Sequence, residues 1–373
     1  MALTGLHTTW QYGSYQKDRD YNIKGYENAP LRDGTDFSGL KPHKDSNSNW
    51  SIAIGYGYDL LKNSVATIKS DMAAVNVTLS AEDETLLNDY HAGKKTKDDV
   101  LNGLTLTLTD EPTATKLLGM KLTKYETALD TALGGHSQLA DSKDRIAIIS
   151  LLYTMVDPVA DKISKKIPST IAAIQNDNRA EAWFEIRYGS NGDGQHASRR
   201  YAEAHLFGLY DSGGTFTDPN EAKEVMRMYT WNKDAIRKYE TAYPPSKYGY
   251  AGIDEDIKDA KNYLIANFAT KVGMSIDGQV IVGAGLPSYA YLEENRIMDE
   301  LTGTDKNDLI FGERGSDIML SGGKGNDVIY GGEGNDKIKG GEGNDYIEGG
   351  AGNDDYYFKS GDGNDKIIDN EGE

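Results

Sequence analysis

The sequence between residues 303 and 368 repeats with a period of nine. Four consecutive nonads read GGKGNDVIY, GGEGNDKIK, GGEGNDYIE and GGAGNDDYY, and they begin at Gly322, Gly331, Gly340 and Gly349. Looser copies flank them: GTDKNDLIF and GERGSDIML come before, and GDGNDKII comes after. A fixed short period predicts that each unit is one small piece of structure that stacks on its neighbours.

Within each nonad, the GGxGxD half predicts a turn and the next three residues predict a short strand. Glycine permits the positive φ that a tight turn needs and leaves the backbone carbonyl groups unshielded. The middle apolar residue of each strand is expected to point inward and to fill a thin core between two parallel strand ladders. These residues are Ile329, Ile338, Ile347 and Tyr356.

The repeat also places one aspartate at the same point of every turn. Carboxylate and carbonyl oxygens are the ligands that Ca²⁺ prefers, with six to eight per ion. The predicted core is too thin to fold unaided, so bound metal has to contribute to folding. We therefore expect several Ca²⁺ ions in the array. The expected ligand positions are Asp308, Asp317, Asp327, Asp336, Asp345, Asp354 and Asp365, with Gly323, Gly325, Gly332, Gly334, Gly341, Gly343, Gly350 and Gly352.

The nonapeptide resembles the RTX, or haemolysin-type, calcium repeat over about residues 303–368. The resemblance implies an all-β parallel β-roll, which we assign to residues 301–373. This segment holds 17 acidic and 7 basic side chains, and so contributes −10 of the net charge of −19. RTX arrays usually accompany type I secretion, which implies a secreted protein and the type I machinery as a partner. The export signal of that route is C-terminal, and none is visible before Glu373, which leaves open that the chain is a fragment.

Composition excludes several other classes of protein. The chain has no cysteine, so it can form neither disulfides nor thiolate metal sites. Its acidity argues against nucleic acid as a partner, because phosphate binding needs Lys and Arg. The N-terminus lacks the basic and apolar regions of a signal peptide. No uninterrupted apolar stretch of about 18 residues is present, so no transmembrane segment is expected.

The segment from Tyr21 to Asp59 contains the residues that could carry catalysis. Glu27 follows the helical pattern YNIKGYE, Asp45 lies in the polar loop KPHKDSNSN, and WSIAIGYGYDL predicts a strand with closely spaced glycines. Two carboxylates beside a β-ribbon can flank a sugar, one as acid and the other as base.

The spacing in this segment resembles that of phage-type lysozymes (endolysins). That family carries a glutamate, then an aspartate, then a hydroxyl residue six positions later in an Ile-Gly-x-Gly strand. Here Ser51 follows Asp45 at this spacing, although 17 residues separate Glu27 from Asp45, which is a longer spacing than in the family. Tyr56 stands where the family often has histidine. A register slipped by two residues remains an alternative, and it would place Ala53 at the hydroxyl position.

Three downstream blocks extend the resemblance over about residues 16–212. They are SKDRIAIISLLYTMV, STIAAIQNDNRAEAWFEI and QHASRRYAEAHLFGLY. The resemblance implies an α+β lysozyme-like domain at 1–212, mostly helical with a small β-lobe. The apolar stretch IAIISLLYTM is expected to form a helix that is buried nearly all round.

What the resemblance implies for function is a muramidase that hydrolyses the β-1,4 bond between N-acetylmuramic acid and N-acetylglucosamine in peptidoglycan. Hydrolysis would proceed by acid/base catalysis with inversion and without a catalytic cofactor. Glu27 would be the general acid, Asp45 would orient or deprotonate the attacking water, and Ser51 would position that water. Arg199 would pair with the acid, with the adjacent Arg200 as the alternative.

Residues 213–300 are expected to form a mainly helical connector of unknown role. A helix is predicted from Asp218 and Pro219 to the pair Pro244–Pro245. A second helix is predicted over about 255–269, and Asp277–Gly278 suggests a hairpin turn.

Together these features predict a secreted, calcium-dependent peptidoglycan hydrolase that acts against other bacteria or in wall remodelling. Two alternatives stay open: a chitinase-like glycosidase on the same fold, or a non-catalytic, calcium-dependent adhesin or binding module.

Overall fold

The computed structural model describes residues 3–35, 38–44, 51–155, 157–191, 194, 196–211, 215–284 and 299–369. The chain divides into two compact units, one of residues 7–168 and one of residues 1–6 with 169–373. This division falls inside the range 1–212 expected for the first domain. The domain boundaries expected at 212 and 300 stay predictions.

The unit of residues 7–168 is mainly helical and carries one small antiparallel sheet, in which β2 pairs with both β1 and β3. Its strands are β1 (His43–Lys44), β2 (Ile52–Ile54) and β3 (Tyr58–Asp59). Its helices are α1 (Tyr15–Arg32), α2 (Val65–Ala74), α3 (Ala81–His91), α4 (Lys97–Gly103), α5 (Glu111–Leu133), α6 (Lys143–Met155) and α7 (Ala160–Lys166).

Local sequence signals explain where these helices begin. Ser64, Ser80, Thr96 and Asp110 precede α2, α3, α4 and α5, and each side chain accepts a backbone N–H from the first turn. Helix α6 is buried continuously from Asp144 to Tyr153, as its apolar sequence predicted. The small sheet and the helices of this unit therefore share a core of their own.

Six further helices lie in the second unit. They are α8 (Pro168–Gln175), α9 (Arg179–Arg187), α10 (Ala197–Phe207), α11 (Pro219–Ala242), α12 (Ile253–Asp256) and α13 (Lys258–Leu264). Asp218 caps α11, whose first residue is Pro219 and which ends before Pro244, so the first connector helix is confirmed. Helix α13 continues as a π-helical turn to Ala269, close to the second predicted helix. No helix in the described ranges is long and apolar enough to cross a membrane.

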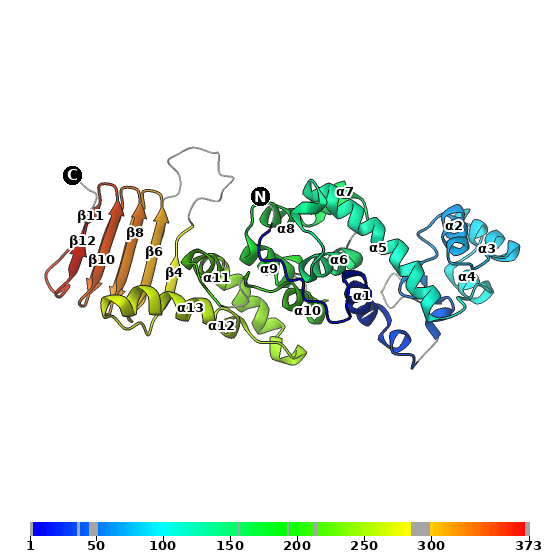
Figure 1. Cartoon of the computed structure of the whole chain (residues 1–373), viewed down its shortest axis with the longest axis horizontal. Helices are drawn as coiled ribbons and strands as arrows, with labels where there is room; N and C mark the ends of the chain where they lie inside the picture. The colour runs from blue at the N-terminus through cyan, green and yellow to red at the C-terminus, as the bar shows by residue number, and fades with distance from the viewer. Residues whose placement is uncertain are drawn as a thin grey trace. The chain divides into compact units, whose positions relative to one another are not determined.

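A parallel β-solenoid forms the C-terminal part of this unit (Figure 1). One sheet has the strand order β12-β10-β8-β6-β4, and the other has the order β11-β9-β7-β5. The strands are β4 (Val280–Val282), β5 (Glu300–Thr302), β6 (Leu309–Arg314), β7 (Met319–Lys324), β8 (Val328–Glu333), β9 (Lys337–Glu342), β10 (Tyr346–Ala351), β11 (Asp355–Tyr356) and β12 (Lys366–Ile368). Neighbouring strands pair in register two nonads apart, with Ile329 opposite Ile347, so one coil contains two nonads.

The predicted core of the solenoid is confirmed. Ile329, Ile338 and Ile347 are fully buried in a single cluster, and Tyr356 packs against its end. The strands are longer than predicted, because β8 and β9 each run six residues, into the glycine pair of the following nonad. The turn is correspondingly shorter than the GGxGxD half.

The two sheets of the solenoid differ on their outer faces. Phe311 on β6 is buried, and its ring stacks on that of Tyr330 on β8 with centroids 5.4 Å apart. Phe268, in the continuation of α13, packs edge-on against both rings, where the helix lies along the sheet (Figure 1). In the other sheet, the matching outer position on β9 is the polar, half-buried Lys339, and the other outer residue of that strand, Lys337, is exposed. The helical connector therefore covers one face of the solenoid.

The hairpin predicted at Asp277–Gly278 is wrong. Strand β4 pairs in parallel with β6, and the backbone N–H of Gly278 donates to the carbonyl oxygen of Asn307. The sheet of the solenoid thus includes Val280 to Val282, which lie in the segment assigned to the connector. The local Asp-Gly signal could not reveal this pairing, because the partner strand lies about one coil further along the chain.

Candidate functional site

A ladder of buried aspartates runs along the solenoid. In each rung, one carboxylate oxygen (Oδ1) accepts the backbone N–H of the aspartate one coil earlier. The Asp308 N–H donates to Asp327 at 2.7 Å, and the Asp327 N–H donates to Asp345 at 2.8 Å. The same contact joins Asp299 to Asp317, Asp317 to Asp336, Asp336 to Asp354 and Asp345 to Asp365.

The second carboxylate oxygen of the ladder has no partner among the described residues. This applies to Oδ2 of Asp317, Asp327, Asp336, Asp345 and Asp354, all of which are buried. A buried, unpaired carboxylate oxygen is costly and needs a compensating partner. A hard cation such as Ca²⁺ supplies such a partner.

Burial also changes the protonation of these groups. It raises the pKa of Asp317 and Asp327 to about 7, and the pKa of Asp336 and Asp345 to about 6, with neighbouring aspartates adding to the shift. The ladder therefore resists ionisation when no cation is present. Bound Ca²⁺ would supply the opposite charge.

No group of three or more His, Asp or Glu side chains converges on one point within the described ranges. The aspartates alone thus cannot supply the six to eight oxygens that calcium prefers. Backbone carbonyl groups of the turns have to supply the others. The predicted glycines make those turns possible.

All eight predicted glycines adopt positive φ. The angles are +105° at Gly323, +106° at Gly325, +121° at Gly332, +129° at Gly334, +115° at Gly341, +147° at Gly343, +109° at Gly350 and +132° at Gly352. A Cβ added at Gly332 would collide with the carbonyl oxygen of Glu313, one coil earlier. These glycines therefore let successive turns stack with their carbonyl groups in close approach.

Replacing Gly332 by alanine is expected to lower the unfolding free energy of the solenoid by about 2–5 kcal/mol. Left-handed backbone costs an L-residue about 1–2 kcal/mol, and overpacking adds about 1–3 kcal/mol. The matched control is Gly361→Ala, since Gly361 has a φ of +99° with nothing within 4 Å. Calcium-loaded full-length variants should be compared by denaturant unfolding. Equal effects of the two substitutions would contradict the stacking role of Gly332.

Some residues of the array were not predicted. The first glycine of each pair has an ordinary φ, but a Cβ at Gly322 or Gly340 would collide with Oδ2 of Asp327 or Asp345. The unbroken GlyGly pair in four nonads was the available signal. Asp362 is buried, and its Oδ1 accepts no hydrogen bond but lies 4.0 Å from Lys359 Nζ, whereas the predicted Asp365 is only half-buried.

Asp308 differs from the other predicted ligands. Its Oδ1 accepts the backbone N–H of Gln279, and its Oδ2 accepts hydrogen bonds from the backbone N–H and the hydroxyl of Thr304. Both oxygens are therefore satisfied by the protein itself. Asp308 belongs to the first coil, where β4 has joined the sheet.

Glu27 lies in the other unit, near the C-terminal end of α1. A Cβ built on Gly57 would lie 3.0 Å from Oε2 of Glu27 and 3.3 Å from the hydroxyl oxygen of Tyr153. Tyr153 donates its hydroxyl proton to the carbonyl oxygen of Tyr56 at 2.6 Å, and Lys121 Nζ donates to that of Gly57 at 3.0 Å. Helices α1, α5 and α6 thus meet the β2–β3 turn around the half-buried carboxylate of Glu27, whose catalytic role stays a prediction.

A second polar cluster fixes the same turn. Tyr56 donates its hydroxyl proton to Oε1 of Glu111 at 2.7 Å, and Lys24 Nζ pairs with the same oxygen at 2.9 Å. Tyr56 therefore joins α1 to the start of α5. Nothing in the sequence pattern had indicated this link.

The other predicted catalytic residues are placed as follows. Asp45 lies outside the described residues. Ser51 is buried, and its hydroxyl donates to Oδ1 of Asp59 at 2.7 Å. Arg199 lies on α10 in the second unit, where its Nε donates to Oε1 of Glu203 at 3.0 Å. The roles of all three stay predictions.

The stacked nonads, with a repeated aspartate ladder and glycines of positive φ in the turns from Gly323 to Gly352, define a calcium-binding β-solenoid. Residues 298–323 and 321–356 match the family model of the RTX calcium-binding nonapeptide repeat, in four copies. The C-terminal region is therefore an RTX calcium-binding array, as the period predicted. No curated protein and no solved structure matches the chain.

Proposed function

We propose that the chain is a secreted peptidoglycan muramidase that carries a calcium-folded RTX tail. The observation that supports catalysis is the position of Glu27, whose half-buried carboxylate lies against Gly57 at the turn of the small sheet. The resemblance of residues 16–212 to phage-type lysozymes assigns the general acid to this residue. The RTX array supports secretion, because such repeats typically occur in secreted proteins and are consistent with a type I route.

In this proposal the acid protonates the leaving glycosidic oxygen. This role requires a carboxyl group that can donate a proton to that oxygen. Asp45 would activate a water on the opposite face of the sugar, with inversion at the anomeric carbon. Calcium has no part in the chemical step. Its contribution is to balance the buried carboxylates of the solenoid.

The test is digestion of purified peptidoglycan by the full chain in calcium, with chitin as the parallel substrate. New reducing ends on N-acetylmuramic acid are expected from peptidoglycan, with little release from chitin. Preferential cleavage of chitin would replace the muramidase by a chitinase-like glycosidase. Calcium-dependent binding without cleavage of either polymer would favour the adhesin.

Ser51→Ala is expected to lower the unfolding free energy by about 1–2 kcal/mol, because it removes a buried hydroxyl that donates to Asp59. If Ser51 also positions the water, turnover of folded enzyme falls as well, and Ser51→Thr retains it. Thermal unfolding and turnover should be measured on the same preparations. Unchanged turnover in Ser51→Ala, with a gain in Ala53→Thr, would support the slipped register instead.

A further inference from the structure

Glu313 breaks the glycine pattern of the solenoid. Four nonads carry GlyGly at their first two positions, but the nonad that begins at Gly312 has glutamate in the second position. Glu313 lies opposite Gly332 in the strand ladder and adopts the same left-handed backbone, with a φ of +79°. This conformation is strained for a residue with a Cβ, and such outliers cluster where a side chain has a task.

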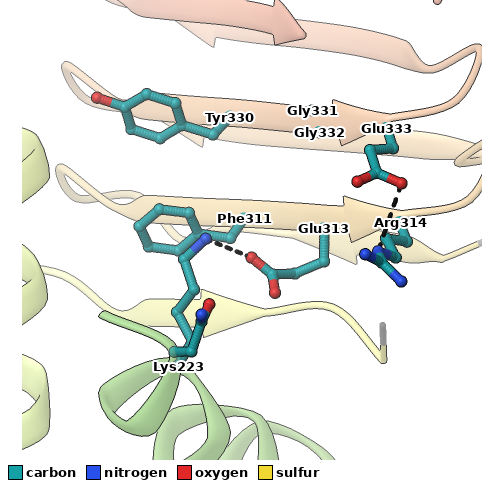
Figure 2. A pocket seen from close by; sticks show the side chains of 9 residues that line it. Lys223, Phe311, Glu313, Arg314, Tyr330, Gly331, Gly332 and Glu333 are labelled. Atoms are coloured by element: carbon teal, nitrogen blue, oxygen red, sulfur yellow. Dashed lines mark hydrogen bonds and ion pairs between the residues drawn. The ribbon is translucent and has the colours of Figure 1, made fainter. Parts of the chain in front are cut away.

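The side chain of Glu313 is held by helix α11. Its Oε1 pairs with Lys223 Nζ at 2.5 Å, and its Oε2 accepts a hydrogen bond from Arg227 Nη2 at 2.7 Å (Figure 2 shows the Lys223 contact). Lys223 also lies 4.4 Å from the ring centroid of Phe311. Side-chain exposure across these pairs is 16–26%, so the contacts are partly shielded from solvent. Both carboxylate oxygens of Glu313 are therefore engaged by the helix.

Other contacts connect α11 in both directions. Arg227 Nε donates to the carbonyl oxygen of Gly283, and the Thr230 hydroxyl accepts the backbone N–H of Val282. Toward the helices, Glu224 of α11 accepts the backbone N–H of Ala180 at the start of α9. Helix α11 thus lies between α9 and the first coils of the solenoid.

We propose that Glu313 couples the calcium-dependent folding of the solenoid coils to the docking of helix α11. The backbone of Glu313 lies in the coil between Asp308 and Asp317, while its carboxylate pairs with Lys223 and Arg227 of helix α11. When the coils are ordered, the carboxylate is presented to Lys223 and Arg227. Because coupling between two sites is reciprocal, docking of α11 also raises the affinity of the coils for calcium. This coupling depends on the RTX array and not on the proposed muramidase activity.

The coupling can be tested with the substitution Glu313→Gly. It restores the glycine of the other nonads, relieves the left-handed strain and removes both ion pairs. The probe is Ca²⁺ added to the apo full-length protein, followed by hydrogen exchange of peptides from α11 and from β6 to β10. The native chain should gain protection in both regions. In the variant, the coils should still gain protection when Ca²⁺ is added. The calcium-dependent protection of α11 should fall roughly fivefold or more, and the calcium concentration at the midpoint of coil protection should rise by a similar factor.

Two further variants complete the test. Glu333→Gln breaks the exposed Arg314–Glu333 pair and should leave α11 unchanged. Substituting Lys223 and Arg227 together by methionine removes the same two ion pairs from the helix side and keeps the left-handed backbone of Glu313, although it also removes the hydrogen bond from Arg227 to Gly283. The loss of calcium-dependent protection in α11 should be at least as large as in Glu313→Gly, and combining all three substitutions should add little to that loss. An unaltered calcium response of α11 in Glu313→Gly, or fully additive effects, would overturn the proposal.

Discussion

Removing calcium from the full chain is expected to abolish the hydrogen-exchange protection of strands β5 to β12. Five buried Oδ2 atoms of the aspartate ladder have no hydrogen-bond partner in the described solenoid, and the segment 301–373 holds 17 acidic side chains against 7 basic ones. The core between the two sheets is thin, with seven buried apolar residues in one cluster. Without a cation, this much repulsion and so little burial are typical of disorder. Exchange should be measured in calcium, in chelator and in magnesium alone, and magnesium should not restore protection because it binds such flexible sites poorly.

A matched pair of substitutions identifies the source of this effect. Asp327→Asn keeps the shape of a fully buried ligand but removes its charge, and should raise the calcium midpoint roughly tenfold or more, because affinity follows ligand charge. Asp355→Asn changes an exposed carboxylate one residue beyond the ladder and should leave the midpoint unchanged. Helices α1 to α7 have their own core and should keep their protection in chelator. Protected solenoid strands in chelator would show that the array folds without metal.

Glu27→Gln is expected to lower peptidoglycan turnover by about 10²–10⁴, the loss typical when general acid catalysis is removed. Glutamine keeps the size of the side chain beside Gly57 but has no transferable proton. The melting temperature should hold or rise, because a half-buried carboxylate is replaced by a neutral group. Release of reducing ends and thermal unfolding should be measured on the same calcium-loaded protein.

The control is Glu82→Gln, which changes an exposed glutamate in the first turn of α3. It should alter neither turnover nor stability. If Glu27→Gln cleaves peptidoglycan as fast as this control, the lysozyme mechanism is wrong, whatever the fold. If both proteins bind the polymer without cleaving it, the non-catalytic alternative gains support.

The solenoid core could be predicted from the sequence because its determinants are local and repeated. Each nonad brings its own inward apolar residue and its own turn glycines, so the inward position of Ile338 follows from the period alone. Strand length was less accessible. Whether the GlyGly pair extends a strand or belongs to the turn depends on pairing with the next coil. Gly323, for example, pairs with Gly341, which lies 18 residues further along the chain.

Neither the helices that cover one face of the solenoid nor its first strand, β4, could be predicted from the repeat. Val280 to Val282 carry no glycine or aspartate signature, and they join the sheet only because Leu309 to Phe311 lie beside them. The outer face did carry a weak signal. Phe311 and Tyr330 occupy matching outer positions in one sheet, whereas Ser321 and Lys339 occupy those positions in the other sheet, and this difference favours one covered sheet.

The candidate catalytic site shows the same limit. The position of Glu27 beside a glycine of the β-ribbon followed from the order of elements along the chain. The partner of Ser51 did not, because the hydroxyl lies within reach of Asp59 only after β2 and β3 pair. Asp45 lies outside the described residues, so its role depends on the resemblance alone.

The most direct test of the calcium array is a calorimetric titration of the metal-free full chain with Ca²⁺. The ladder predicts binding of more than one ion per chain, a negative heat-capacity change as the apolar core is buried, and no comparable heat from Mg²⁺. Two results would contradict the account that calcium bound at the ladder aspartates stabilises the solenoid. One is a chain that takes up no calcium, and the other is a chain that binds calcium and magnesium alike without a heat-capacity change.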